Sequence, residues 1–285
     1  MSNKIGWIGL GKMGFPMANN LLKGGYSLYV YNRTSSKADA LVNEGAVLAE
    51  SIPVLCEESD IIFTMLSDDQ AVKGAYLGEG GLLNGKVGGK LFINMSTVSP
   101  RTSAELQEMS EAVGARFLEA PVSGSVKPAE DGTLLILVGG TADDFRAAQP
   151  IFEKLGKMAV HLGSVGAGSS AKLAINYFLA LTLQGLAETV LFAKQQGINA
   201  EDMLRIVNEG ACGSAITKLK TPTIASNEYP TAFALKHMAK DLRLAREQGI
   251  SFPLAGPLAD TYKQALDDGL GDEDVMAIIK YLERS

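Results

Sequence analysis

The apolar run of residues 5–10 passes directly into a glycine-rich turn and then into a segment of helical period. The turn reads Gly9-Leu10-Gly11-Lys12-Met13-Gly14, which is a G-x-G-x-x-G pattern between strand and helix. Gly9 permits the tight turn, Gly11 lets the backbone approach a pyrophosphate, and Gly14 lets the helix pack on the strand. The helix N-terminus adds free N–H groups and a partial positive charge. Glycine turns are common, but one at the first strand of an alternating chain predicts a dinucleotide site.

Short apolar runs and helical segments alternate over about 160 residues. Such alternation indicates a parallel sheet that is covered by helices on both faces. Strands are predicted at residues 5–10, 27–31, 61–65, 91–94, 117–118, 134–138 and 159–162. Thr141 is the expected N-cap of a helix that ends near residue 155.

The chain has no strand pattern after the glycine-rich segment of residues 163–168. Helices are predicted there at residues 168–196, 200–209, 214–226, 234–248, 254–268 and 272–283. The fold class is therefore α/β: an N-terminal Rossmann-type dinucleotide-binding domain followed by an all-helical C-terminal domain. We place the first over residues 1–163 and the second, for substrate binding and oligomerisation, over residues 164–285.

Composition excludes several classes of partner. A formal net charge of -6 gives no electrostatic footprint for nucleic acid. Only two cysteines are present, as suits a reducing cytosol, and the first residues run into a strand without a signal peptide. Gln184 and Glu188 interrupt the long apolar stretch, which favours a buried helix over a membrane span. We expect a cytoplasmic protein without nucleic-acid or membrane partners.

The end of the second predicted strand bears on the choice of cofactor. An NAD site normally has Asp or Glu there for the ribose 2′-OH. This chain instead has Tyr31-Asn32-Arg33-Thr34-Ser35-Ser36-Lys37. Arg33 can form a forked contact with a 2′-phosphate, and Lys37 and the hydroxyls add donors. A solvated basic turn is the alternative, but the position favours NADP(H).

Lys172 and Asn176 are polar residues in a stretch that is otherwise mostly Leu, Ala, Ile and Phe. Residues four apart share a helix face, so the ammonium and the amide project together. An ammonium in apolar surroundings is costly without partners. A lysine whose stem packs while its head stays in water is the alternative. Taken with the rest of the sequence, the pair indicates a catalytic site.

The segment after the fifth predicted strand is rich in small polar residues. Ser123, Gly124 and Ser125 offer hydroxyl and backbone N–H donors that suit a carboxylate. In open α/β sheets, ligands bind at the carboxyl ends of the strands, where this segment begins. A plain Pro-, Ser- and Gly-rich turn is the alternative.

These segments together resemble the β-hydroxyacid dehydrogenase family over the whole chain. The matching pieces are Gly9-Leu10-Gly11-Lys12-Met13-Gly14, Pro121-Val122-Ser123-Gly124, Gly166-Ala167-Gly168 with Lys172 and Asn176, and Lys240-Asp241-Leu242. Within the family, the chain is most similar to the glyoxylate/succinic semialdehyde reductases (γ-hydroxybutyrate dehydrogenases). The segments that carry this finer likeness are Asn32-Arg33-Thr34, Met65-Leu66-Ser67-Asp68, Ser123-Gly124-Ser125 and Lys236-His237.

The resemblance implies a role for each matching residue. Lys172 is implied to be the catalytic general acid, with Asn176 as its companion. Ser123 and Gly124 are implied to bind the substrate carboxylate, and Phe233 and Asp241 to line the substrate pocket. Thr97 and Lys240 are implied to contact the nicotinamide end of the cofactor, with Thr97 also next to the substrate. The other implied cofactor contacts are Gly9, Leu10, Gly11, Lys12, Met13, Gly14, Asn32, Arg33, Thr34, Lys37, Leu66 and Ser67.

The implied activity is NADPH-dependent reduction of short carboxylated aldehydes, succinic semialdehyde or glyoxylate, by hydride transfer. The chain departs from many members of the family at Ser125, where they have Gly, and at Ile175, where they have Asn. A 3-hydroxyisobutyrate or tartronate semialdehyde type dehydrogenase is the main alternative. Imine reduction predicts another acid in place of Lys172, and a non-catalytic NADP-binding protein is expected to have lost that lysine.

Other chemistries have weaker support. His161 and His237 lack a metal-ligand spacing with carboxylates, so no metal site is expected. The chain has no Gly-x-Ser-x-Gly nucleophile elbow. The long apolar helix leaves surface to cover, so we expect a homodimer or homotetramer that associates through its helical domains.

Overall fold

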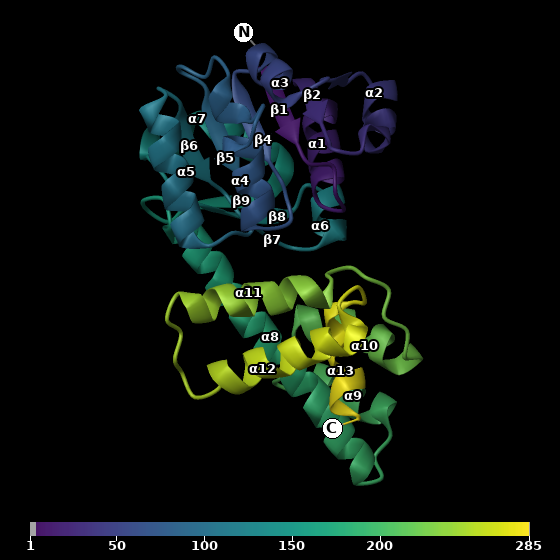
Figure 1. Cartoon of the computed structure of the whole chain (residues 1–285). Helices are drawn as coiled ribbons and strands as arrows, with labels where there is room; N and C mark the ends of the chain where they lie inside the picture. The colour runs from purple at the N-terminus through teal and green to yellow at the C-terminus, as the bar shows by residue number, and fades with distance from the viewer. Residues whose placement is uncertain (1–3, 285) are drawn as a thin grey trace. The chain divides into compact units, whose positions relative to one another are not determined.

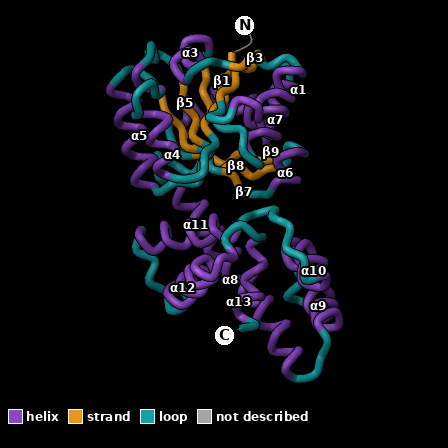
Figure 2. The backbone as a smooth tube through the Cα atoms, turned by 45° about the vertical axis from the view of Figure 1, so that its right-hand side comes forward, coloured by secondary structure: helices purple, strands orange, loops and turns teal. Residues whose placement is uncertain are grey.

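The computed structural model describes residues 4–284, which form two compact units. The first unit extends to Lys172 and the second begins at Leu173, so the division falls inside a helix, after the expected domain boundary at residue 163. The predicted α/β class is confirmed: all strands lie in the first unit and the second is helical (Figures 1 and 2). Residues 1–3, on which the signal-peptide expectation depends, lie outside the described residues.

The first unit contains a six-stranded, wholly parallel sheet with the order β3-β2-β1-β4-β5-β6. Its strands are β1 (Lys4–Ile8), β2 (Ser27–Tyr31), β3 (Val47–Leu48), β4 (Ile61–Thr64), β5 (Leu91–Asn94) and β6 (Arg116–Glu119). The strand order reverses between β1 and β4. In doubly wound sheets, ligands bind at the carboxyl ends of the strands at such a switch point.

Helices cover both faces of this sheet, as expected. One apolar core joins the sheet to α1 (Gly14–Lys23) and α7 (Ala142–Leu155). A second core joins the other face to α3 (Ile52–Glu58), α4 (Asp69–Leu77) and α5 (Pro100–Ala112). Strands buried on both faces need apolar side chains at consecutive positions, which explains the unbroken run Ile61-Ile62-Phe63. The smaller helical elements of this unit are η1 (Ser35–Ala38), α2 (Asp39–Asn43), η2 (Leu82–Asn84) and α6 (Val126–Glu130).

The last two predicted strands, at residues 134–138 and 159–162, correspond to β8 and β9 of a separate three-stranded sheet. Its order is β7 (Val122–Ser123), β8 (Leu134–Val138) and β9 (Gly156–His161), and β7 is antiparallel to β8. An isolated bridge between Glu119 and Gly139 joins the two sheets. Neither β3 nor β7, each only two residues long, was predicted.

The second unit is built on α8 (Ala167–Gln195), whose buried face packs in a core of its own. The other helical elements are α9 (Ala200–Glu209), α10 (Ala215–Ser226), α11 (Leu235–Glu247), α12 (Ala255–Ala265), η3 (Leu266–Leu270), η4 (Val275–Ala277) and α13 (Ile278–Leu282). The α-helix predicted at residues 254–268 ends at Ala265 and continues as a π-helical turn over Leu266–Leu270. Gly269 has a φ of 85°, in the left-handed region that glycine tolerates.

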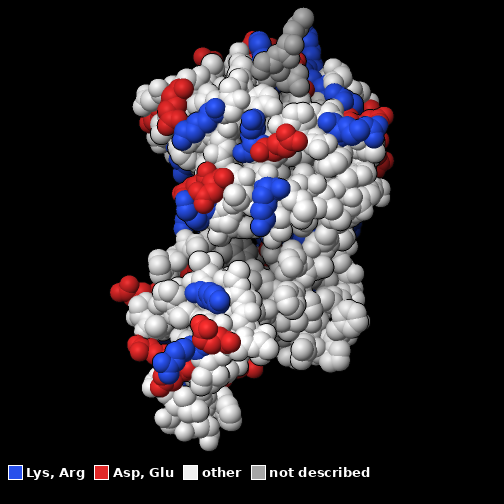
Figure 3. All heavy atoms as spheres, turned by 180° about the vertical axis from the view of Figure 1, so that it is seen from behind, with Lys and Arg blue, Asp and Glu red and all other residues white. Residues whose placement is uncertain are grey.

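Helix α8 is long and apolar enough to cross a membrane, by length and composition alone. A core helix of a globular protein passes the same test. Leu183, Ala187 and Val190 of this helix are buried in the core of the second unit, as expected for a core helix. On the face drawn in Figure 3, acidic and basic side chains are interspersed.

Candidate functional site

The glycine turn has the geometry that its sequence predicts. Gly9 has a φ of +102°, and a Cβ there would lie 2.3 Å from the carbonyl oxygen of Met65. A Cβ on Gly14 would lie 2.0 Å from the carbonyl oxygen of Gly9, so α1 can pack this closely only on glycine. A Cβ on Gly11 would meet no atom within 4 Å, which leaves its backbone open to a ligand. Met13, the N-cap of α1, supplies no side-chain cap. This turn therefore fits a bound pyrophosphate.

Asn32 ties the end of β2 to the glycine turn. Its Oδ1 accepts a hydrogen bond of 2.9 Å from the backbone N–H of Leu10, and its Nδ2 donates to the carbonyl oxygen of Thr34. Arg33 and Lys37 are exposed beside it, and neither takes part in an ion pair within residues 4–284. A carboxylate is absent from this turn between residues 31 and 37. The turn thus presents cations to an incoming anion.

Buried polar side chains organise the ends of β4 and β5. Thr64 donates to Oδ1 of Asn94 at 3.0 Å, and the same oxygen accepts from the backbone N–H of Ser96. The hydroxyl of Ser96 in turn accepts from the backbone N–H of Leu66 at 2.9 Å. The loops that carry Leu66 and Thr97, two expected cofactor contacts, are therefore held side by side.

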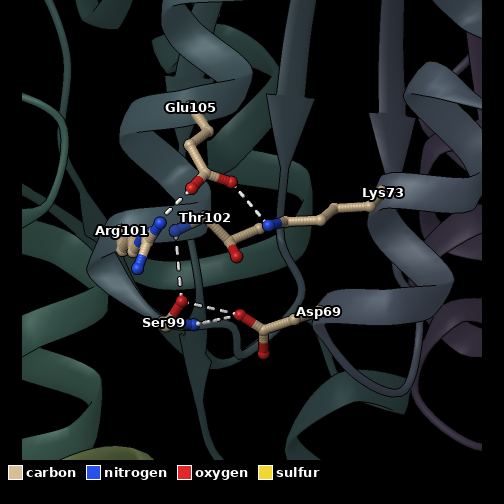
Figure 4. A network of polar contacts seen from close by, with 6 residues as sticks. All are labelled: Asp69, Lys73, Ser99, Arg101, Thr102 and Glu105. Atoms are coloured by element: carbon tan, nitrogen blue, oxygen red, sulfur yellow. Dashed lines mark hydrogen bonds and ion pairs between the residues drawn. The ribbon is translucent and has the colours of Figure 1, made fainter. Parts of the chain in front are cut away.

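A second network fixes the helices that follow these two strands (Figure 4). Asp69 accepts hydrogen bonds from both the backbone N–H and the hydroxyl of Ser99, at 3.0 and 2.7 Å. Glu105 of α5 pairs with Lys73 of α4 and with Arg101. Hydrogen bonds from these two cations lower the pKa of Glu105. The network thus ties Ser99, the last residue of the loop of residues 95–99, to Asp69 at the start of α4.

The segment expected to bind a carboxylate begins as a strand rather than a turn. Ser123 is half-buried in β7, opposite Leu135 of β8. Gly124 has a φ of +141°, and a Cβ there would lie 2.7 Å from the side chain of Leu134. Only glycine fits this position, so its requirement is structural whatever the segment binds.

Lys172 and Asn176 share one face of α8, as predicted, and both are buried, with relative exposures of 7% and 3%. Asn176 donates from Nδ2 to Oδ2 of Asp241 on α11 at 2.5 Å. The other carboxylate oxygen of Asp241 lies 3.3 Å from Nζ of Lys240. Asn176, Asp241 and Lys240 therefore form one polar chain in the helical unit.

Phe233 lies in a loop that a buried ion pair holds. Asp274 accepts from the backbone N–H groups of Ala232 and Phe233 at 3.1 and 3.2 Å. It also accepts from Lys220 at 2.7 Å, and both charged side chains are buried. The ring of Phe233 stacks on His237 with centroids 6.2 Å apart. The ion pair thus fixes the backbone of Phe233.

The structure distributes the expected site residues over both units. The first unit contains the glycine turn, Asn32, Arg33, Thr34, Lys37, Leu66, Ser67, Thr97, Ser123, Gly124 and Lys172. The second unit contains Asn176, Phe233, Lys240 and Asp241. Sequence reasoning missed Asp69, Asn94 and Asp274. Asp69 follows β4 and Asn94 ends β5, both at the ligand-binding edge of the sheet, so their positions could have been used to predict them. No pattern in the sequence pointed to Asp274. His161 is structural: its Nε2 lies 2.9 Å from the carbonyl oxygen of Gly140.

Comparisons with known proteins agree with this geometry. Residues 4–163 match the NAD binding domain of 6-phosphogluconate dehydrogenase, and residues 166–282 match the NAD-binding domain of NADP-dependent 3-hydroxyisobutyrate dehydrogenase. The chain is 39% identical to glyoxylate/succinic semialdehyde reductase 1 of Arabidopsis thaliana, over 99% of each chain.

Solved structures give the same picture. The chain resembles Mycobacterium tuberculosis 3-hydroxyisobutyrate dehydrogenase with L-serine at a TM-score of 0.88 and 31% identity, over 99% of each chain. It resembles Psf3 in complex with NADP+ and 2-OPP at a TM-score of 0.89 and 27% identity, over 98% of this chain and 99% of the other.

Proposed function

Because the chain belongs to the β-hydroxyacid dehydrogenase family of NAD(P)-dependent oxidoreductases, we propose that it reduces short carboxylated aldehydes to hydroxy acids with NADPH. Succinic semialdehyde and glyoxylate are the proposed substrates. The observation that carries the proposal is the buried pair Lys172 and Asn176 on one face of α8. The similarity to the Arabidopsis reductase supports the choice of substrate.

The choice of NADPH rests on the exposed turn after β2. Arg33 and Lys37 offer donors where an NAD site has a carboxylate. A guanidinium can bind a phosphate through two parallel hydrogen bonds, which a ribose hydroxyl cannot match. Asn32 fixes this turn to the glycine turn, so the two proposed phosphate sites are held at a constant separation.

The chain's own residues supply orientation, charge and a proton. When bound, the cofactor supplies the hydride. As the carbonyl is reduced, negative charge grows on its oxygen, and the ammonium of Lys172 stabilises that charge and delivers the proton. Asn176 is held by Asp241 through its Nδ2. Its amide oxygen is a hydrogen-bond acceptor, of the kind that suits an ammonium or a hydroxyl.

The substrate carboxylate is proposed to bind at Ser123 and Gly124. A carboxylate anchored there fixes the reacting carbonyl at one distance, so chain length acts through positioning. Thr97, in the loop that Asn94 and Asp69 brace, is proposed to contact both substrate and cofactor. Phe233 and Asp241 are the other residues proposed to line the substrate pocket.

A substrate panel tests the proposal. We expect butyraldehyde to have a kcat/KM about tenfold or more below that of succinic semialdehyde, because its methyl group covers a donor of the carboxylate site without pairing with it, at a cost of about 1–3 kcal/mol. Glyoxylate should be intermediate, since it is too short to span the same distance. NADPH oxidation is followed by absorbance. Equal efficiency for the uncharged aldehydes contradicts the anchoring role of Ser123.

A dehydrogenase of the 3-hydroxyisobutyrate or tartronate semialdehyde type is the second candidate. It is favoured by the match of residues 166–282 and by the likeness to the Mycobacterium tuberculosis enzyme. Adding 3-hydroxyisobutyrate with NADP+ to the panel decides between them: the alternative requires faster turnover with this pair than the reduction of succinic semialdehyde.

Exposed apolar side chains support the proposal of a homo-oligomer. Ile175, Phe178 and Phe192 of α8 are 42%, 63% and 64% exposed. Large apolar side chains repeated along one helix favour a protein partner, and a second copy is the partner proposed here.

A further inference from the structure

The carboxylate of Glu119 binds the beginning of α8 through hydrogen bonds. Glu119 ends β6 and is fully buried. Its Oε1 accepts hydrogen bonds from the backbone N–H groups of Gly166, Gly168 and Ser169 at 2.6, 2.8 and 3.2 Å. Its Oε2 accepts from the hydroxyl of Ser169 at 2.5 Å. A single side chain thus satisfies donors in the first turn of the helix, which otherwise lack intrahelical partners.

The position of this carboxylate is itself fixed by both sheets. The backbone of Glu119 exchanges two hydrogen bonds with Gly139 at the end of β8, at 3.0 and 2.9 Å. A Cβ on Gly139 would lie 2.4 Å from Oε1 of Glu119. A Cβ on Gly168 would lie 2.4 Å from the carbonyl oxygen of Leu137. The helix start and the carboxylate therefore have little room to shift.

Ser169 connects the carboxylate of Glu119 to the face of α8 that carries Lys172, the proposed general acid. Ser169, Lys172 and Asn176 are spaced by three and four residues, so they lie along one face of α8. The hydroxyl of Ser103 on α5 lies 3.0 Å from that of Ser169 and restrains the same face from the side. Rotation or sliding of the helix start moves all three polar side chains together.

We propose that Glu119 is a positioning residue for the reaction. It sets the rotation of the start of α8 about the helix axis and its position along that axis, and thereby the place of the Lys172 ammonium. The inference rests on the proposed role of Lys172. Hydrogen bonds to a carboxylate are stronger than neutral ones, and a negative group is stabilising at a helix N-terminus. A small misplacement of a proton donor lowers turnover without a matching loss of substrate binding.

The first experiment replaces Glu119 with glutamine. Glu119→Gln keeps the size of the side chain and one acceptor oxygen but removes the charge and converts the other oxygen into a donor. We expect kcat for succinic semialdehyde to fall about tenfold, while KM and the Kd for NADPH stay within about twofold. A kcat equal to that of the unmodified enzyme overturns the proposal. So does a loss confined to NADPH binding.

Asp144→Asn is the matched control. Asp144 is also a buried carboxylate of the first unit; it pairs with Arg116 and lies in the first turn of α7, which carries no proposed site residue. We expect this variant to lose thermal stability but to keep its kcat. If both variants lower kcat by the same factor, Glu119 acts through general stability and the proposal is wrong.

The decisive measurement combines Glu119→Gln with Lys172→Ala. If Glu119 acts through Lys172, the first change has no further effect once the lysine is gone, so the two effects are not additive. Additive losses overturn the positioning role. If Glu119→Gln does not fold, Ser169→Ala takes its place in the same cycle; it removes the bond to Oε2 and the contact with Ser103 but keeps the carboxylate and its backbone bonds. A Lys172→Ala variant with normal turnover contradicts the proposed function itself, whereas a slow Lys172→Ala beside a normal Glu119→Gln contradicts only this inference.

Discussion

Replacing Lys172 with alanine is expected to lower kcat for succinic semialdehyde by about 10²–10⁴, the usual contribution of a positioned proton donor. The fold and the binding of NADPH should be retained, because the proposed cofactor contacts lie on other elements. The change also removes an ammonium from a site that is only 7% exposed.

Lys194→Ala is the control for the lysine variant. Lys194 lies on the same helix, but it is exposed and pairs with Glu283. We expect its kcat to be unchanged. Turnover is measured by NADPH oxidation and stability by thermal unfolding. Near-normal kcat and KM in Lys172→Ala would show that the lysine has a structural role only.

Replacing Arg33 with alanine is expected to lower kcat/KM for NADPH by about ten- to a hundredfold and to leave the value for NADH nearly unchanged. A hydrogen bond to a charged group contributes about 1.5–3 kcal/mol, and only NADPH carries the 2′-phosphate that Arg33 is proposed to bind. The measurement is kcat/KM for both cofactors at constant ionic strength, since exposed charges are screened by salt.

Arg146→Ala provides the matched control for that experiment. Arg146 is an exposed arginine of the same unit that pairs with Asp143 on α7. We expect it to change neither cofactor's kinetics. Equal use of NADPH and NADH by the unmodified enzyme would contradict the selectivity that we assign to the turn after β2.

Local patterns determined most of the fold. The strands at residues 27–31, 91–94 and 134–138 have the predicted bounds, and Thr141 is the N-cap of α7 as expected, its hydroxyl accepting from the backbone N–H of Asp144. Periodicity, caps and glycine turns act over a few residues, so one sequence is enough to reveal them. The same rule placed Lys172 and Asn176 on one helix face.

The sequence determined the fold class, the glycine turn and the polar pair on α8, because each follows from residues that are neighbours along the chain. Only the tertiary structure decided that β7, β8 and β9 form a separate sheet. It alone shows that Asp274 holds the loop of Phe233 and that Glu119 accepts hydrogen bonds from the start of α8. Glu119 and Gly168 are 49 residues apart, and Phe233 and Asp274 are 41 apart. A buried carboxylate looks like any other acidic residue in the sequence, since its partners are brought to it only when distant strands and helices pack.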